Sequence, residues 1–142
     1  MTIKQLSIFL ENKSGTLIKV LDLLKKSNVQ LIATTIADTA EYGICRIICS
    51  EPARAYLELQ EGGVAVALTD VFAIELDNIP GAGADAIQAF SECGISIPYL
   101  YSFLTGKKAI LIFRTDNNAQ AREVIAKNNL KFVTEADLAN WA

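Results

Sequence analysis

The residues best suited to bind a small molecule lie in two short polar loops, Glu11–Gly15 and Asp77–Gly81. Each loop follows an alternating apolar segment and precedes a segment with helical spacing. The first backbone N–H groups of a helix have no partner within the helix, and they carry a partial positive charge. A carboxylate or another anion therefore fits there. The glycine allows close backbone approach, and the asparagine can donate and accept hydrogen bonds.

An ordinary turn followed by a helix cap would use the same residue types, because Asn, Ser, Pro and Gly all favour turns. One copy of the loop would not decide between the two interpretations. The loop occurs twice, however, and Gly15 of the first copy corresponds to Gly81 of the second. This recurrence favours a binding site.

The two loops belong to a repeat that extends along the whole chain. The shift that places Gly15 on Gly81, called the repeat shift below, also places Asn12 on Asn78. It aligns the apolar positions of the flanking segments without a gap. Few residues are identical, but the apolar pattern and the turn residues agree throughout. We predict two units, residues 1–70 and 71–142.

Both units show the same order of elements, strand, helix, strand, strand, helix, strand. In the first unit we predict these elements near residues 6–10, 16–26, 29–37, 43–50, 52–61 and 64–68. In the second we predict them near residues 72–76, 84–93, 95–103, 109–114, 118–127 and 130–133, with a short helical turn after Thr134. This order predicts an α+β fold of two tandem ferredoxin-like βαββαβ units. Each antiparallel sheet carries its helices on one face, and we expect the two sheets to join side by side.

Composition excludes several functions. The net charge of −3 gives no support for binding nucleic acids or anionic membranes. No apolar stretch approaches the ~20 residues that span a bilayer, and the N-terminus lacks the apolar core of a signal peptide. We therefore predict a cytoplasmic protein.

Histidine is absent, which removes Ser-His-Asp catalysis, Cys-His catalysis and most zinc sites. We predict neither a metal nor a cofactor. Cys45 and Cys49 lie roughly 13 Å apart if they share a strand, too far for a disulfide. We expect both, and Cys93, to be free thiols that are buried as small apolar residues.

The first loop and its surroundings resemble the ACT domain. The resemblance rests on an alternating strand, then Glu-Asn-Lys-Ser-Gly, then an amphipathic helix that opens with Thr16 and Leu17. It covers almost the whole chain as two copies. ACT domains are ferredoxin-like regulatory modules that commonly bind amino acids. The resemblance implies a ligand between the first loop of one unit and the second strand of another.

Carried over position by position, the resemblance implies a set of ligand-binding residues. In the first unit these are Asn12, Ser14, Gly15 and Leu17, with Leu31, Ile32 and Ala33 on the second strand. In the second unit they are Asn78, Pro80 and Gly81, with Ile95, Ser96 and Ile97 on the second strand. The candidate set also includes Ile79, Ala82, Gly83 and Ala84 around the second helix start. Tyr99 is a further candidate to line the ligand side chain, although packing in the core or at a strand edge is the favoured interpretation of this aromatic residue.

The segment from Gly81 to Ala84 has almost no side chains, whereas the first unit has Thr16 and Leu17 in the equivalent region. We expect more room at the second helix start, and hence a better pocket there. Tight helix packing would explain the same small residues.

A chain made of ACT units alone resembles a stand-alone regulator. We expect it to sense a free amino acid and to act through a regulated enzyme or through self-association. The alternative is an interaction module without a ligand. An enzyme is disfavoured, because the sequence shows no phosphate loop, metal cluster or nucleophile–base pair.

Overall fold

The computed structural model describes residues 1–38 and 41–141. Strands and helices follow the predicted order along this part of the chain, except that two predicted strands form one. The first half runs β1(Ile3–Glu11), α1(Thr16–Lys26), β2(Leu31–Asp38), β3(Tyr42–Cys49), α2(Pro52–Glu61) and β4(Val66–Asp77). The second half runs α3(Ala82–Glu92), β5(Leu100–Thr105), β6(Lys108–Phe113), α4(Asn118–Lys127), β7(Lys131–Phe132) and α5(Glu135–Trp141).

The chain forms two compact units, and each combines two segments of sequence. The N-terminal unit contains Lys4–Thr69 and the C-terminal helix α5. The C-terminal unit contains Met1–Ile3 and Asp70–Thr134. The predicted units, 1–70 and 71–142, are by contrast continuous in sequence.

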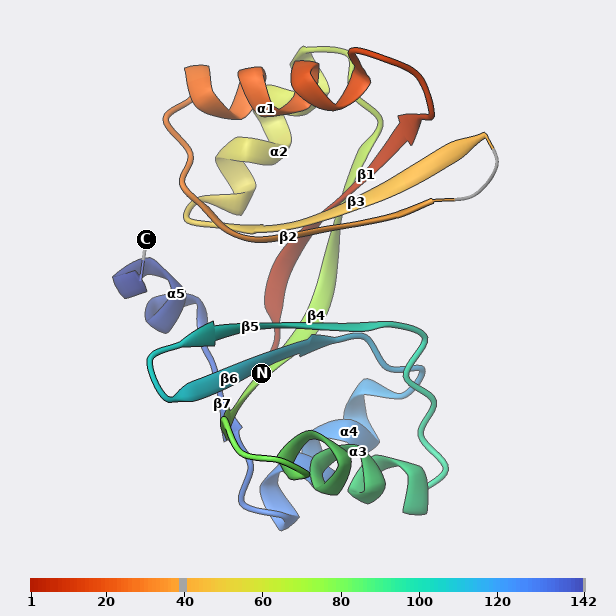
Figure 1. Ribbon diagram of the computed structural model, residues 1–142, viewed down its shortest axis with the longest axis vertical. Helices are drawn as coiled ribbons and strands as arrows, with labels where there is room; N and C mark the ends of the chain where they lie inside the picture. Colours follow the sequence, from red (N-terminus) through yellow and green to blue (C-terminus); the bar gives the residue numbers. More distant parts are fainter. Residues whose placement is uncertain (39–40, 142) are drawn as a thin grey trace. The chain divides into compact units, whose positions relative to one another are not determined.

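In the N-terminal unit an antiparallel sheet with the order β2-β3-β1-β4 carries α1 and α2 on one face (Figure 1). The register pairs Leu6 with Ile47 and Ile8 with Cys45, so these buried side chains share the face below the helices. Val20 and Leu24 of α1 pack against them in one apolar core. Burial of this face explains why the alternating pattern forms a strand here.

The C-terminal unit repeats this arrangement, with β6 between β4 and β5 and with β7 beside β4. Its core contains Phe72, Phe90 and Phe113, which are fully buried. The rings of Phe90 and Phe113 meet edge to face with their centroids 5.2 Å apart. Such a pair favours one arrangement of α3 on the sheet. The α+β fold of two ferredoxin-like units is confirmed.

The backbone keeps the repeat that the sequence shows. Helices α1 and α2 have the same lengths as α3 and α4, and the repeat shift places the start of each on the start of its counterpart. The left-handed residues obey the same shift, since Asn28 (φ 55) corresponds to Gly94 (φ 71) and Gly63 (φ 81) to Asn129 (φ 53). Asn and Gly are the residues that adopt this conformation at least cost.

The predicted strands near 64–68 and 72–76 are one strand, β4, whose residues up to Thr69 belong to the N-terminal unit. Residues 64–77 contain no glycine or proline, so nothing in the backbone stops the strand between the repeats. The predicted division of this strand is wrong. Side-by-side joining of the two sheets stays a prediction.

The predicted helical turn at the C-terminus is present as α5, which lies on the face of the N-terminal sheet opposite α1 and α2 (Figure 1). Its Glu135 carboxylate accepts a hydrogen bond of 2.7 Å from the backbone N–H of Lys4. Leu138 is buried. Helix α5 thus belongs to the unit that contains the first repeat.

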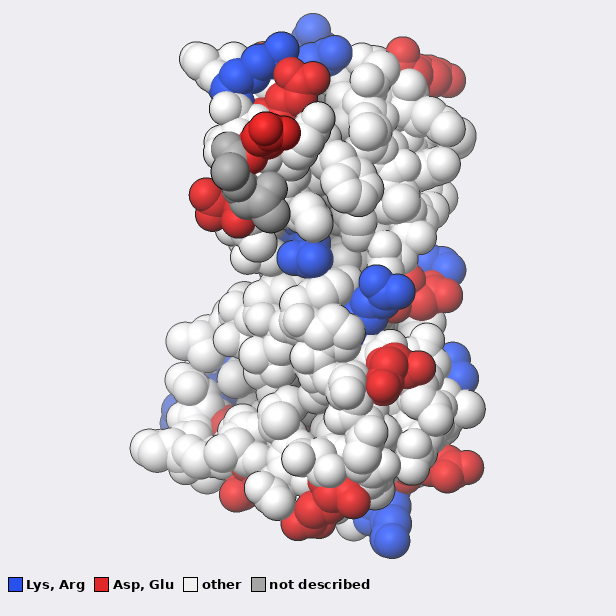
Figure 2. Space-filling view, turned by 90° about the vertical axis from the view of Figure 1, so that its right-hand side faces the viewer, with Lys and Arg blue, Asp and Glu red and all other residues white. Residues whose placement is uncertain are grey.

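The face in Figure 2 shows small groups of acidic and basic side chains separated by uncharged surface. No broad basic patch occurs on this face, as expected for a chain with a net charge of −3. Among the described residues, no helix has the length and apolar character needed to cross a membrane.

The three cysteines are free, as predicted. Cys45 and Cys49 belong to the N-terminal core, and burial raises the pKa of both thiols to about 11. The expected burial of Cys93 is wrong, because this residue lies at the exposed C-terminal end of α3. A thiol is nucleophilic only as the thiolate, so the buried pair is protected both sterically and chemically.

We therefore expect a thiol reagent at pH 8 to modify Cys93 alone in the folded protein and all three cysteines after denaturation. Counting the thiols that react with a disulfide reagent such as DTNB before and after adding guanidinium would test this. The Cys93→Ser variant is the control and should show no fast-reacting thiol when folded. Rapid reaction of two or more thiols in the folded protein would contradict the burial of the pair.

Candidate functional site

The first loop is held by its own backbone. The N–H of Asn12 donates to the carbonyl oxygen of Glu41 at 3.0 Å, which attaches the loop to the residue before β3. The N–H of Lys13 donates to the carbonyl oxygen of Glu11 at 2.8 Å and forms a tight turn around Asn12. Asn12 is therefore placed by its main chain, whichever groups its side chain meets.

The second loop repeats this pattern. The N–H of Asn78 donates to the carbonyl oxygen of Lys107 at 3.1 Å, and the N–H of Ile79 donates to the backbone carbonyl oxygen of Asp77 at 2.9 Å. The two hydrogen bonds of the first loop thus recur at the equivalent positions of the second. The recurrence that the sequence showed in Asn and Gly is a recurrence of loop conformation.

Both loops end on a glycine that the helix start requires. Gly15 has φ 90 and Gly81 has φ 87, and each immediately precedes the first turn of its helix. A Cβ at either glycine would meet nothing within 4 Å, so the requirement is for backbone conformation, not for space. L side chains rarely adopt such a positive φ.

A hollow of about 580 Å³ opens beside the first loop in the N-terminal unit. Its walls come from the end of β1, the loop, the start of α1, the start of β3 and the segment before β4. The lining residues are Phe9, Leu10, Glu11, Lys13, Ser14, Gly15, Thr16, Lys19, Val20, Tyr42, Gly63, Val64 and Ala65. Of the predicted residues, Ser14 and Gly15 are here.

Charged groups at this hollow include one ion pair and one further lysine. Lys13 Nζ lies 2.9 Å from a Glu11 carboxylate oxygen, and their hydrogen bond lowers the pKa of Glu11 and raises that of Lys13. Lys19 Nζ lies 4.0 Å from the position that a Cβ at Gly63 would occupy, so the absence of a side chain there leaves room for the ammonium group. Among the described residues none forms an ion pair with Lys19. The walls carry a net positive charge.

The C-terminal unit has a hollow of about 350 Å³ beside the second loop. Its lining residues are Leu76, Asp77, Ile79, Pro80, Ala82, Asp85, Ala86, Ala89, Asn128 and Leu130. Under the repeat shift, most of them correspond to residues of the first hollow. Their charge differs, because Asp85 occupies the place of Lys19 and Ile79 that of Lys13.

The expectation of more room at the second helix start is wrong. Gly83 and Ala84 do not line the second hollow, and a Cβ at Gly83 would meet nothing within 4 Å. The small residues Gly83 and Ala84 therefore lie on the outer surface of α3, where they do not enlarge the hollow. Asn128 lines the second hollow, whereas Gly62, its counterpart under the repeat shift, does not line the first.

The predicted residues on and after α1 lie apart from the first hollow. Leu17 packs against the N-terminal core. Leu31 and Ile32 begin β2, and Leu31 lines a different hollow of about 450 Å³ near the C-terminal end of α1. Within the N-terminal unit these residues are not brought to the loop, and their role in binding stays a prediction.

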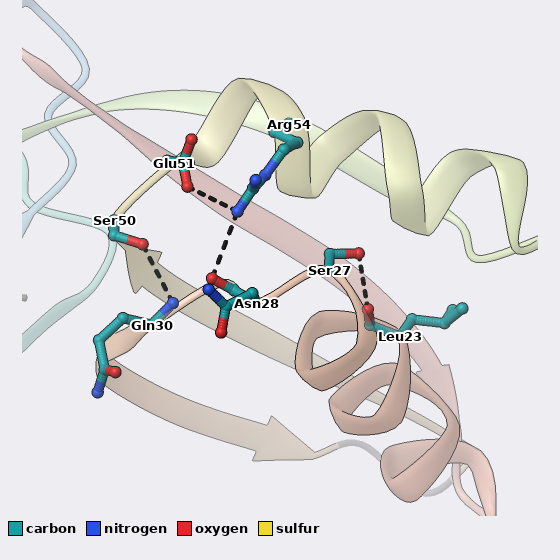
Figure 3. A network of polar contacts seen from close by, with 7 residues as sticks. All are labelled: Leu23, Ser27, Asn28, Gln30, Ser50, Glu51 and Arg54. Carbon is teal, nitrogen blue, oxygen red and sulfur yellow. Dashed lines mark hydrogen bonds and ion pairs between the residues drawn. The ribbon is translucent and has the colours of Figure 1, made fainter.

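Polar contacts close the end of the unit where β2 begins (Figure 3). The Arg54 guanidinium donates to the carbonyl oxygen of Asn28 at 3.3 Å and pairs with the Glu51 carboxylate at 2.6 Å. The N–H of Gln30 donates to Ser50 Oγ at 3.1 Å. These contacts hold the left-handed turn at Asn28 against the start of α2, which is a structural task.

The predicted second-strand residues of the C-terminal unit are not on a strand. Strand β5 begins at Leu100, after Ile95, Ser96, Ile97 and Tyr99. Ile95 is buried in the core, and the N–H of Ser96 donates to Asp116 Oδ1 at 3.0 Å. The predicted start of this strand is too early, because Pro98 has no N–H to donate to a neighbouring strand.

Several residues that line the first hollow were not predicted from the sequence, namely Phe9, Lys19, Tyr42, Gly63 and Val64. They lie on different elements, and only folding brings them to the loop. For Gly63 the sequence did contain a signal of its turn conformation. The repeat shift places it on Asn129, and Gly and Asn both favour a left-handed turn. In the described part of the chain, no three His, Cys, Asp or Glu residues gather where they could hold a metal ion.

Comparison with known proteins gives one family. The family model described as the ACT domain pair matches residues 1–142. A solved structure of a protein from Bacteroides thetaiotaomicron has 41% identity and a TM-score of 0.93, and the match covers 98% of this chain and 96% of that one. No curated protein matches this chain.

Regulatory subunits of aspartate kinase share the fold at low identity. The subunit from Thermus thermophilus, solved in a ligand-free form, has 15% identity and a TM-score of 0.63, with coverage of 87% of this chain and 91% of that one. The subunit from Thermus flavus has 18% identity and a TM-score of 0.58, with coverage of 85% and 86%.

Gly81 and Gly83 provide a matched test of the loop conformation. We expect Gly81→Ala to lower the free energy of unfolding by about 1–2 kcal/mol, because its φ of 87 strains an L residue. Gly83→Ala should raise it by about 0.5–1 kcal/mol, because Gly83 lies inside α3 with open space at its Cβ. Urea unfolding measures both. Equal effects of the two substitutions would contradict the role of the left-handed glycine.

Proposed function

This chain belongs to the family of ACT domain pairs, and on that premise we propose that it is a regulatory protein that binds a free amino acid. The binding residues in this proposal are those of the two loops, with Ser14 and Gly15 at the first and Ile79, Pro80 and Ala82 at the second. We propose that the protein acts in the cytoplasm and catalyses no reaction itself.

One observation carries the proposal, namely a hollow that recurs beside the loop before α1 and before α3. Volumes of about 580 and 350 Å³ lie in the range of sites for small molecules. Each hollow combines apolar walls with the start of a helix, whose N–H groups suit a carboxylate. An amino acid has that carboxylate and a side chain of matching size.

Regulation in this proposal works through another protein or through self-association. The family model of the ACT domain pair, a regulatory module, matches residues 1–142. Binding at a loop would shift the equilibrium between two conformations or assemblies only if the ligand binds one of them more tightly. The regulatory subunits of aspartate kinase support this role by analogy of fold.

A second candidate is an interaction module without a ligand. The edge strands β2 and β5 favour it, because Ile36 (47% exposed) and Leu104 (63% exposed) present apolar side chains there. An open strand edge can pair with another chain. Such a module would not need the loop glycines or the hollows.

A ligand screen separates the two candidates. We expect one or a few of the twenty amino acids at millimolar concentration to raise the temperature of unfolding by several degrees. A ligand present at 100 times its dissociation constant adds about 2.7 kcal/mol, which is a shift of this size for a small domain. Differential scanning fluorimetry provides the measurement, with the D enantiomer of each hit as the control. No shift with any amino acid would favour the interaction module.

A further inference from the structure

Each unit covers its sheet with a layer of two helices, α1 and α2 in the first layer and α3 and α4 in the second (Figure 1). The exposed charges of α1 and α3 are opposite. Helix α1 has three lysines and one aspartate, namely Lys19, Lys25, Lys26 and Asp22. Helix α3 has Asp85 and Glu92, and residues 82–92 contain neither lysine nor arginine. The net charge is therefore +2 on α1 and −2 on α3.

The reversal holds at equivalent positions. The repeat shift places Lys19 on Asp85 and Lys26 on Glu92, and the two positions are seven residues apart in each helix. Residues with this spacing lie two turns apart on the same side of a helix. Helix α1 thus presents a positive stripe, and α3 presents a negative stripe in the same place.

The second helix of each layer has the other sign. Helix α2 carries Arg54, Glu58 and Glu61, and α4 carries Arg122, Glu123 and Lys127. The net charge is therefore −1 on α2 and +1 on α4. The first layer is positive on α1 and negative on α2, whereas the second is negative on α3 and positive on α4. The two layers are complementary helix by helix.

Both layers are open to solvent within the chain. Ile18 of α1 is 56% exposed and Leu57 of α2 is 55% exposed. Ile18 also lines a hollow of about 410 Å³ along α1, together with Lys19 and Lys26. On α3 a Cβ at Gly83 would meet nothing within 4 Å. A partner for either layer therefore has to come from another molecule.

A second copy of this chain supplies the complementary layer. Because the two layers have the same fold, placing α3 of one copy antiparallel on α1 of another also places α4 on α2. Lys19 then meets Glu92 at one end of α1, and Lys26 meets Asp85 at the other. The contact also removes the exposed apolar side chains of α1 and α2 from water. Pairing of two like layers would instead bring equal charges together, which is unfavourable.

We infer that the first helical layer is a docking surface for the second helical layer of another copy of this chain. The stripe residues of α1 and α3 select this pairing. A contact between unlike surfaces is heterologous, so every copy offers both halves of the interface. The inference goes beyond amino-acid binding, because the contact needs no ligand.

The salt dependence of self-association is the first test. Sedimentation velocity of the full chain without amino acids should show association at protein concentrations up to millimolar. The association should weaken about tenfold or more between about 0.1 M and 1 M salt, because the screening length falls from about 10 to 3 Å. Pairing of strand edges uses backbone hydrogen bonds, so the salt-sensitive step reports on the helical layers. The absence of such a step would overturn the inference.

Charge reversal identifies the surfaces. Lys19→Glu with Lys26→Glu makes both stripes negative, and Asp85→Lys with Glu92→Lys makes both positive. Each double variant alone should lose the salt-sensitive association by about tenfold or more, because like charges oppose each other. An equimolar mixture of the two should regain it. The variant with all four substitutions keeps the net charge of −3 and should associate as the original chain does.

The design separates the stripes from net charge and from folding. The two double variants change the net charge in opposite directions, so a general charge effect would not dissociate both. Circular dichroism checks folding, and Lys19→Gln with Lys26→Gln provides a milder pair that should show a smaller loss. Association that survives in both double variants, or a mixture that does not regain it, would overturn the inference. Failure of the amino-acid screen would leave these outcomes unchanged.

Discussion

The left-handed turn between the first strand of each unit and the helix that follows is the constraint on which the rest of the site depends. The alternating strand must bury Leu6, Ile8 and Leu10 against a helix that runs back over the same sheet. Only the short segment 12–15 separates the strand from the helix, and a glycine at φ 90 makes the reversal. That reversal places the first turn of α1, with Thr16 and Lys19, beside the hollow. A residue restricted to negative φ would start the helix in another direction.

The repeat shows how one backbone can hold two different surfaces. Turn positions tolerate few residue types, so Gly, Asn and the loop hydrogen bonds recur in both units. Exposed positions on the helix face no such restriction, and Lys19 and Asp85 differ in sign. The two units therefore share the loop conformation and differ in the charge beside it. A repeated loop conformation therefore does not imply a repeated surface.

Predictions from the sequence were accurate where a pattern was local and failed where distant residues decide. The periods of two and 3.6 residues, together with the turn residues, predicted the order of strands and helices correctly. The prediction of two strands in place of β4 is wrong, because no local signal tells whether two adjacent apolar segments continue as one strand. The predicted start of β5 is too early, because the residues before Pro98 are apolar but the proline has no N–H to donate to a neighbouring strand. Ile95 is buried in the core without belonging to a strand.

By itself the sequence determined the repeat, the fold of each unit, the family and the two loops, because each depends on residue type at short and regular spacing. Tertiary structure alone decided the composition of the units, in which α5 joins the first repeat and Met1–Ile3 joins the second. It also decided which side chains border each hollow, because Phe9, Lys19, Tyr42 and Gly63 come from separate elements. The lack of side chains near Gly83 did not predict a cavity, since the open space lies outside the helix. The physical reason is the same throughout: spacing along a chain sets local conformation, whereas a cavity depends on which surfaces the packed elements leave uncovered.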